Sequence, residues 1–110
     1  MTIDRDGFPI AFATDDGTVV VNFGVLTGRE ATQAELDRLA LALRRGGAGH
    51  RMTITAARRQ DYGRRAETVL HQVRVSLPRS ATPPTSWVEA TCGEWAMSCA
   101  QDRSVEPLPP

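Results

Sequence analysis

Four arginines in the middle of the chain are the residues best suited to bind a ligand: Arg58, Arg59, Arg64 and Arg65. A guanidinium group presents paired N–H donors that match the oxygens of a phosphate, so this segment is a candidate anion-binding site. The alternative is a solvated hairpin whose charges discourage pairing with other strands. No helix-turn-helix, RNA-recognition aromatic motif or zinc knuckle accompanies these arginines, so nucleic acid is not a favoured partner.

The charges are segregated along the chain although they sum to zero. Residues 1–43 contain three arginines and seven acidic residues, which gives −4. Residues 44–79 contain nine arginines and two acidic residues, which gives +7, and residues 80–110 contain one and four, which gives −3. The basic block could therefore contact the acidic ends of a second copy of the chain as well as an external anion.

Cys92 and Cys99 are the two cysteines of the chain. On a continuous helix their spacing separates the Cα atoms by about 10.5 Å, whereas a disulfide requires less than about 7 Å. We therefore expect two free thiols that are buried as small hydrophobic side chains. His50 and His71 add no closely spaced pair of ligands, so the sequence predicts neither a metal site nor a cofactor.

His71 is expected on the apolar face of a strand, where its ring needs a hydrogen-bond partner. It could form a catalytic pair with Cys92 or Cys99, or it could be a core histidine bonded to a neighbouring polar group. Nucleophilic catalysis usually adds a third group that orients the base, and none is evident in the sequence. The structural interpretation is favoured, and no catalytic residue is assigned.

The length and composition indicate one domain with a conventional core. The chain has 110 residues, of which 41% are hydrophobic, and both values are ordinary for a single domain. No apolar run approaches the ~20 residues that span a bilayer, and the charged amino terminus does not resemble a signal peptide. We therefore expect a cytoplasmic protein with no membrane partner. All 13 basic residues are arginine, which we attribute to the codon bias of a high-GC bacterium.

Two strands are predicted near the amino terminus. Phe8, Ile10 and Phe12 alternate with small residues, and the turn signal Asp15–Gly17 follows. A second run has the same period of two: Val19, Val21, Phe23 and Val25. If both apolar sets face one side of a sheet, the loop has an even number of residues, and a four-residue loop pairs Phe12 with Val19.

A helix is predicted next, because Thr32 and Glu35 match the capping-box pattern that begins many helices. Apolar residues then recur at helical spacing, and Gly46–Gly47 ends the helix. The preceding segment, Gly24–Glu30, lacks any phosphate-binding glycine motif. We interpret that segment as a plain connection between a strand and a helix.

A second hairpin and a second helix complete the predicted elements. The strands alternate over Met52–Ala57 and Val69–Leu77, and an even loop between them places Ile54 opposite His71 and Arg58 opposite Glu67. The helix runs from about Ser86 to Gln101, and Ser86 with Glu89 matches a second capping box. Its apolar stripe consists of Val88, Cys92, Trp95 and Cys99.

The order ββαββα predicts an α+β fold: a two-layer sandwich in which one four-stranded, largely antiparallel sheet carries two helices on one face. Residues 1–102 form this single domain, and residues 103–110 form a flexible proline-rich tail. The other sheet face is expected to be small, flat and nearly neutral. It would carry Ala11, Ala13, Val20, Asn22, Thr53, Thr55, Ala57, Leu70 and Gln72.

The leading functional hypothesis is a non-enzymatic interaction or regulatory domain that forms a homodimer. Its interface is expected on the neutral sheet face and on the terminal helix, which follows a proline-rich connector that could let it pack on a neighbouring subunit. The residues concerned are Val20, Thr53, Thr55, Leu70, Trp87 and Met97. The alternative is an anion-binding module, for nucleic acid or a phosphorylated ligand, that uses the arginine-rich hairpin. The third hypothesis is a small enzyme with a site between subunits.

Overall fold

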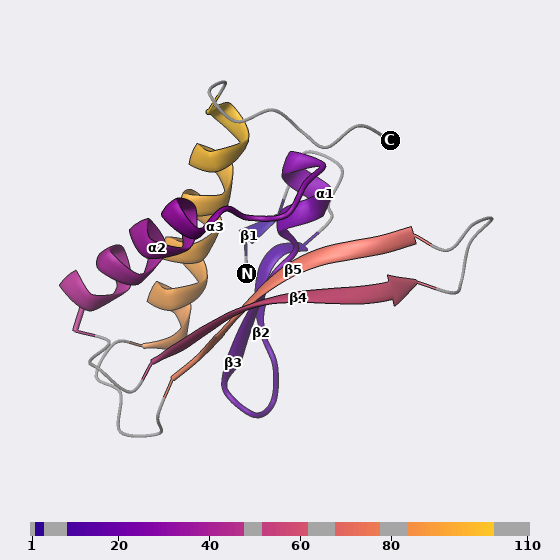
Figure 1. Ribbon diagram of the computed structural model, residues 1–110. Coiled ribbons are helices and arrows are strands. Elements are labelled where there is room, and N and C mark those ends of the chain that lie inside the picture. The colour runs from indigo at the N-terminus through magenta and orange to yellow at the C-terminus, as the bar shows by residue number, and fades with distance from the viewer. Residues whose placement is uncertain (1, 4–8, 48–51, 62–67, 78–83, 103–110) are drawn as a thin grey trace.

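A computed structural model describes residues 2–3, 9–47, 52–61, 68–77 and 84–102 (Figure 1). Its strands are β1 (Thr2–Ile3), β2 (Pro9–Ala13), β3 (Thr18–Val21), β4 (Thr53–Asp61) and β5 (Thr68–Ser76). Its helices are α1 (Phe23–Thr27), α2 (Gln33–Arg45) and α3 (Thr85–Gln101). The tail predicted for residues 103–110 lies outside the described residues.

The strands form one antiparallel sheet in the order β1-β2-β3-β5-β4. The predicted α+β sandwich is confirmed: β2, β3, β5 and β4 make the four-stranded sheet, and the two-residue strand β1 extends one edge. The middle of the sheet belongs to β3 and β5 because these strands carry the valines that the core buries completely. Those residues are Val19, Val21, Val73 and Val75.

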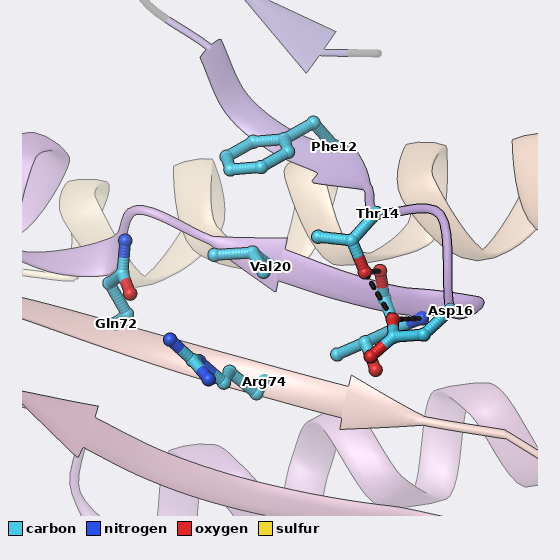
Figure 2. Close-up of a pocket in the computed structure, with 7 residues that line it drawn as sticks. Phe12, Thr14, Asp16, Val20, Gln72 and Arg74 are labelled. Atoms are coloured by element: carbon cyan, nitrogen blue, oxygen red, sulfur yellow. Dashed lines mark hydrogen bonds between the residues drawn. The ribbon is translucent and has the colours of Figure 1, made fainter.

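The helices lie on one side of the sheet. Figure 2 looks onto the opposite face, and the helices appear behind the strands. Helix α3 packs against β2 and β3, α1 packs against β5, and α2 packs against α3. The predicted apolar stripe of α3 is buried in this layer, so α3 completes the core of its own chain.

The predicted pairing of the first hairpin is wrong by one residue. The structure pairs Phe12 with Val20. Thr14 donates its backbone N–H to the carbonyl oxygen of Thr18 at 2.8 Å, so these two residues form the last pair of the hairpin. Three residues, 15–17, lie between them. Gly17 closes the loop with φ 84°, a left-handed conformation that glycine adopts at little cost.

This change in the loop exchanges the two faces of β2, because side chains alternate along a strand. Ala11 and Ala13 lie opposite Val21 and Val19 on the side of the helices, not on the open face where the sequence places them. Phe12 instead faces the open side of the sheet, where it lines a hollow with Val20 (Figure 2).

The predicted extension of β3 to Val25 is also wrong, because β3 ends at Val21 and the chain turns into the single-turn helix α1. A Cβ atom at Gly24 would lie 3.0 Å from both the Cβ and the backbone nitrogen of His71. Glycine therefore permits α1 to approach β5 closely. Gly28 ends α1 with φ 74°. The turn buries Phe23 and leaves Val25 43% exposed, so two apolar residues at a spacing of two did not by themselves indicate a continuing strand.

Helix α2 forms as predicted. Its first turn contains the complete capping box: the Glu35 N–H donates to Thr32 Oγ1 at 3.2 Å, and the Thr32 N–H donates to Glu35 Oε1 at 2.9 Å. Leu39 and Leu43 are fully buried, and Gly46 caps the carboxyl end. The local sequence specifies this helix because the cap, the apolar spacing and the glycine all agree.

The second hairpin has the predicted parity but a different register. Ile54 lies opposite Val75 instead of His71, and Arg58 lies opposite His71 instead of Glu67. Because the shift is an even number of residues, each strand keeps its predicted face. The alternation fixes the face, whereas the register depends on the length of the turn, which the pattern does not specify.

Helix α3 begins one residue before the predicted start and has no side-chain cap, so the predicted Ser86–Glu89 capping box is wrong. Glu89 Oε1 instead accepts a hydrogen bond from the backbone N–H of Ala13 at 3.1 Å. The carboxylate therefore ties α3 to the end of β2. A long-range backbone donor has replaced the local donor that the capping motif would have used.

Candidate functional site

The candidate site is the sheet face that the helices leave uncovered. Its exposed side chains include Thr53 and Thr55 from β4 and Arg74 and Ser76 from β5. The register places Thr53 opposite Ser76 and Thr55 opposite Arg74. These four side chains consist of three hydroxyl groups and one guanidinium.

A hollow of about 220 Å³ lies on this face between β2, β3 and β5 (Figure 2). Phe12 and Val20 form its apolar part. The β2–β3 turn borders it at one end, and two side chains of β5 border it at the other. Its lining residues are Phe12, Thr14, Asp16, Thr18, Val20, Gln72 and Arg74.

Gln72 is the most deeply placed polar residue of the hollow, with only 4% of its surface exposed. Its Nε2 donates to Asn22 Oδ1 at 2.8 Å. Its Oε1 is buried and accepts no hydrogen bond from any described residue. A buried amide oxygen without a donor costs free energy, so this atom is an unmet acceptor at the edge of the hollow.

Two opposite charges border the hollow. Arg74 is exposed, and its guanidinium forms no hydrogen bond or ion pair with another described residue. Asp16, at the turn, accepts hydrogen bonds from the Thr14 hydroxyl and from the Thr18 N–H. The hydroxyl contact is the main reason why the pKa of Asp16 is lowered. The hollow therefore has a cationic end with free donors and an anionic end whose carboxylate is already engaged.

The predicted interface residues do not form one surface. Val20, Thr53 and Thr55 share the open sheet face, and Leu70 occupies a β5 position opposite Arg59. Val20 is 95% buried by its own chain, since only 5% of its surface is exposed. The remaining two residues, Trp87 and Met97, belong to α3 in the helical layer.

Trp87 and Met97 also differ from each other. Trp87 is half-buried and lies against Gly46, where a Cβ atom would overlap its indole ring. Its ring therefore contributes to the contact between α3 and the end of α2. Met97 is 44% exposed on the outside of α3. Within the chain, only Met97 of this pair retains a large free apolar surface.

The four candidate anion-binding arginines are only partly described. Arg58 and Arg59 are consecutive positions of β4, and Arg64 and Arg65 lie outside the described residues. The anion-binding role of this hairpin stays a prediction.

The residues that might have formed a nucleophilic site do not show its features. Cys92 and Cys99 are buried free thiols, as predicted. Burial raises the pKa of each thiol to about 12, so the reactive thiolate is scarce at neutral pH. The Nδ1 atom of His71 is buried and has no hydrogen-bond partner among the described residues, in contrast to the predicted bonded core histidine.

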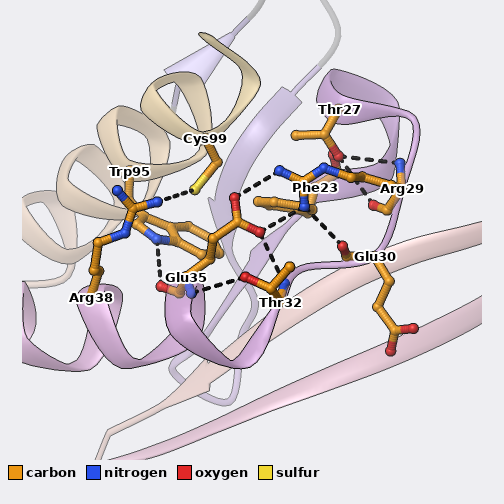
Figure 3. A network of polar contacts seen from close by, with 9 residues as sticks. All are labelled: Phe23, Thr27, Arg29, Glu30, Thr32, Glu35, Arg38, Trp95 and Cys99. Carbon is orange, nitrogen blue, oxygen red and sulfur yellow. Dashed lines mark hydrogen bonds and ion pairs between the residues drawn. The ribbon is translucent and has the colours of Figure 1, made fainter. Parts of the chain in front are cut away.

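A second polar cluster lies inside the helical layer (Figure 3). Arg29 and Glu35 form two parallel hydrogen bonds, Nη1 to Oε1 at 2.6 Å and Nη2 to Oε2 at 2.7 Å. Their side chains are only 4% and 2% exposed. The Arg29 guanidinium also lies 5.4 Å from the ring centroid of Phe23. The interpretation of Gly24–Glu30 as a plain connection therefore missed a buried ion pair.

Glu35 connects helix α2 with helix α3 and with the segment that precedes α2. Its carboxylate binds Arg29 and the N–H of Thr32, and its backbone oxygen accepts the indole N–H of Trp95 at 2.8 Å. The bonds from Arg29 lower the pKa of Glu35 to about 2, although burial opposes this shift. The pKa of Arg29 is raised, mainly by the same bonds. Because these charges satisfy each other, the cluster has the character of a structural element.

Comparison of the chain with protein-family models, with curated proteins and with solved structures finds no match. Within the described ranges, no helix is long and apolar enough to cross a membrane. The same residues contain no group of three or more histidine, cysteine, aspartate or glutamate side chains that could hold a metal ion. The geometry of the open sheet face is therefore the main indication of function.

Sequence reasoning placed Val20 and Gln72 on the open face but missed the hollow. It assigned Phe12 to the core, because the length of the first loop decides the face and could not be read from the pattern. Arg74 was not predicted as a site residue, because one arginine in an alternating strand is typical of a solvated face. The nearest available signal was Gln72 itself, a polar residue that alternates with the apolar residues Val73 and Val75 on β5.

Proposed function

We propose that this protein is a non-enzymatic interaction domain that self-associates through the open face of its sheet. The observation that carries the proposal is the one-sided packing of the fold. The helices cover one sheet face, whereas the other presents the neutral, exposed side chains of Thr53, Thr55 and Ser76. An open sheet face can pack against the same face of a second copy across a two-fold axis.

The chemistry of the described residues supports a binding role. The two thiols are buried with raised pKa values, and the buried carboxylate of Glu35 is neutralised by Arg29. Catalysis by general acid, base or nucleophile needs such groups to reach a substrate. We further propose that the domain acts in the cytoplasm.

The test is the solution mass, measured by light scattering at low salt and at about 0.5 M salt, where charge contacts are screened. We expect a dimer under both conditions, because the proposed surface is neutral. Dissociation at high salt would implicate the arginine block and the acidic ends instead. A monomer under both conditions would contradict the proposal.

Two matched variants locate the interface. Thr53→Arg places a charge on the open face opposite Ser76, and Met97→Arg places the same charge on the outside of α3. Both parent residues are exposed, so neither change disturbs the core. We expect Thr53→Arg to give a monomer and Met97→Arg to remain a dimer. The reverse result would move the interface to the helical layer.

A further inference from the structure

We propose that the hollow on the open sheet face binds a small monocarboxylic acid that carries an N–H donor next to its carboxylate, as an N-acylated amino acid does. This inference does not rest on self-association, because every residue of the hollow belongs to one chain, and Thr53, Thr55 and Ser76, which carry the self-association proposal, are not among the residues that line it. Arg74 binds the carboxylate, Gln72 accepts the N–H, and Phe12 with Val20 contacts the apolar part of the ligand.

The carboxylate end follows from Arg74. Its guanidinium borders the hollow, is exposed, and forms no polar contact with another described residue. Guanidinium and carboxylate groups match as two parallel N–H···O bonds. Arg29 forms such a pair with Glu35 elsewhere in this chain, whereas Arg74 has the donors without the acceptor.

The neighbouring donor follows from Gln72. Its Nε2 is held by Asn22, which directs Oε1 away from that bond and leaves it without a donor in the described part of the chain. Gln72 and Arg74 are two positions apart on β5, so they lie on the same face of the sheet, where both line the hollow (Figure 2). When Arg74 moves onto a ligand carboxylate, an N–H group one carbon away from that carboxylate can reach the amide oxygen. The ligand then satisfies an acceptor that the chain alone leaves unmet.

The rest of the hollow restricts the ligand. Phe12 and Val20 supply an apolar surface for an acyl group. Asp16 lies at the far end and keeps its negative charge, since its pKa is lowered. A second anionic group at the other end of the ligand would meet this carboxylate, so the hollow favours a monocarboxylate over a dicarboxylate. A volume of about 220 Å³ limits the ligand to a small molecule or to the last residue of a peptide.

The first experiment titrates hippurate (N-benzoylglycine) into ¹⁵N-labelled protein and follows the amide resonances by NMR. Hippurate has the carboxylate, the adjacent N–H and an apolar ring. Two close analogues each lack one feature: its methyl ester lacks the charge, and N-methylhippurate lacks the N–H. We expect saturable shifts at Phe12, Val20, Arg74 and the Gln72 side-chain amide for hippurate, and at least about tenfold weaker binding for each analogue.

The second experiment uses two matched variants. Arg74→Gln removes the cation of the hollow, and Arg44→Gln removes an exposed arginine from the end of α2. Both parent side chains are exposed, so both variants should fold, which their NMR spectra will verify. We expect Arg74→Gln to weaken hippurate binding at least about tenfold and Arg44→Gln to leave it unchanged.

Equal shifts for hippurate and both analogues, or unchanged binding to Arg74→Gln, would overturn the proposal. N-acetyl-trialanine carries the same carboxylate and adjacent N–H at the end of a peptide. Binding of either hippurate or this tripeptide, weakened by Arg74→Gln, supports the site. Tighter binding of the tripeptide than of hippurate assigns the site to a peptide carboxyl terminus, and the opposite order assigns it to a free N-acyl amino acid. A dimer that occludes the face is detected separately, because the Thr53→Arg variant would then bind hippurate more tightly than the parent protein.

Discussion

Arg29 and Arg74 occupy opposite situations in the same small fold. Arg29 lies in the helical layer, is 4% exposed and forms a two-bond pair with Glu35. Arg74 lies on the open sheet face, is exposed and has no polar partner among the described residues. A satisfied buried charge holds elements together, whereas a free charge beside an unmet acceptor is available to a ligand.

The largest expected effect is on stability, from removing the buried member of this comparison. Arg29→Gln leaves Glu35 ionised and buried with no countercharge, and breaking such a pair from one side costs about 3–5 kcal/mol. Arg74→Gln, the same substitution on the open face, should change the free energy of unfolding by less than about 0.5 kcal/mol. Urea denaturation of both variants measures the contrast. Similar losses in the free energy of unfolding for the two variants would contradict the structural role given to Arg29 alone.

Acid should break the same ion pair. The pKa of Glu35 is about 2 in the folded protein and 4.5 when unperturbed. A lowered folded pKa contributes stability that is complete above pH 4.5 and is lost as the pH falls towards 2. The contribution of this group is about 3 kcal/mol. Urea denaturation of the parent protein and of Glu35→Gln between pH 7 and pH 2 tests this expectation. The free energy of unfolding of the variant should fall less between pH 4.5 and pH 2 than that of the parent protein. An identical pH dependence in both proteins would contradict the role given to Glu35.

The smallest expected effect concerns the two thiols of the helical layer, which should not react with an alkylating agent in the folded protein. Cys92 and Cys99 are buried, and burial raises both pKa values to about 12. We expect iodoacetamide to leave both thiols unmodified in the native protein at pH 8 and to modify both in urea. Mass spectrometry counts the added groups. Rapid modification of one native thiol would reopen the hypothesis of a reactive cysteine.

Local patterns determined the parts of the fold in which neighbouring residues supply the whole interaction. Helix α2 formed as predicted, because Thr32 and Glu35 cap it and Gly46 ends it within one short segment. The stripe of α3 was also predicted, because helical spacing alone selects it. The cap of α3 was not, because Glu89 found a backbone donor on β2 that is distant in sequence. Loop length likewise decided the face of Phe12, which no alternation pattern contains.

The sequence by itself determined the α+β class, the two long helices, the free thiols and the existence of a neutral sheet face. These features follow from periodicity and from contacts a few residues apart. Only the tertiary structure brought Arg29 to Glu35 in a buried layer and placed Gln72, Arg74 and Phe12 around one hollow on the opposite face. Burial and polar satisfaction are properties of the packed chain, because each depends on which distant residue supplies the partner.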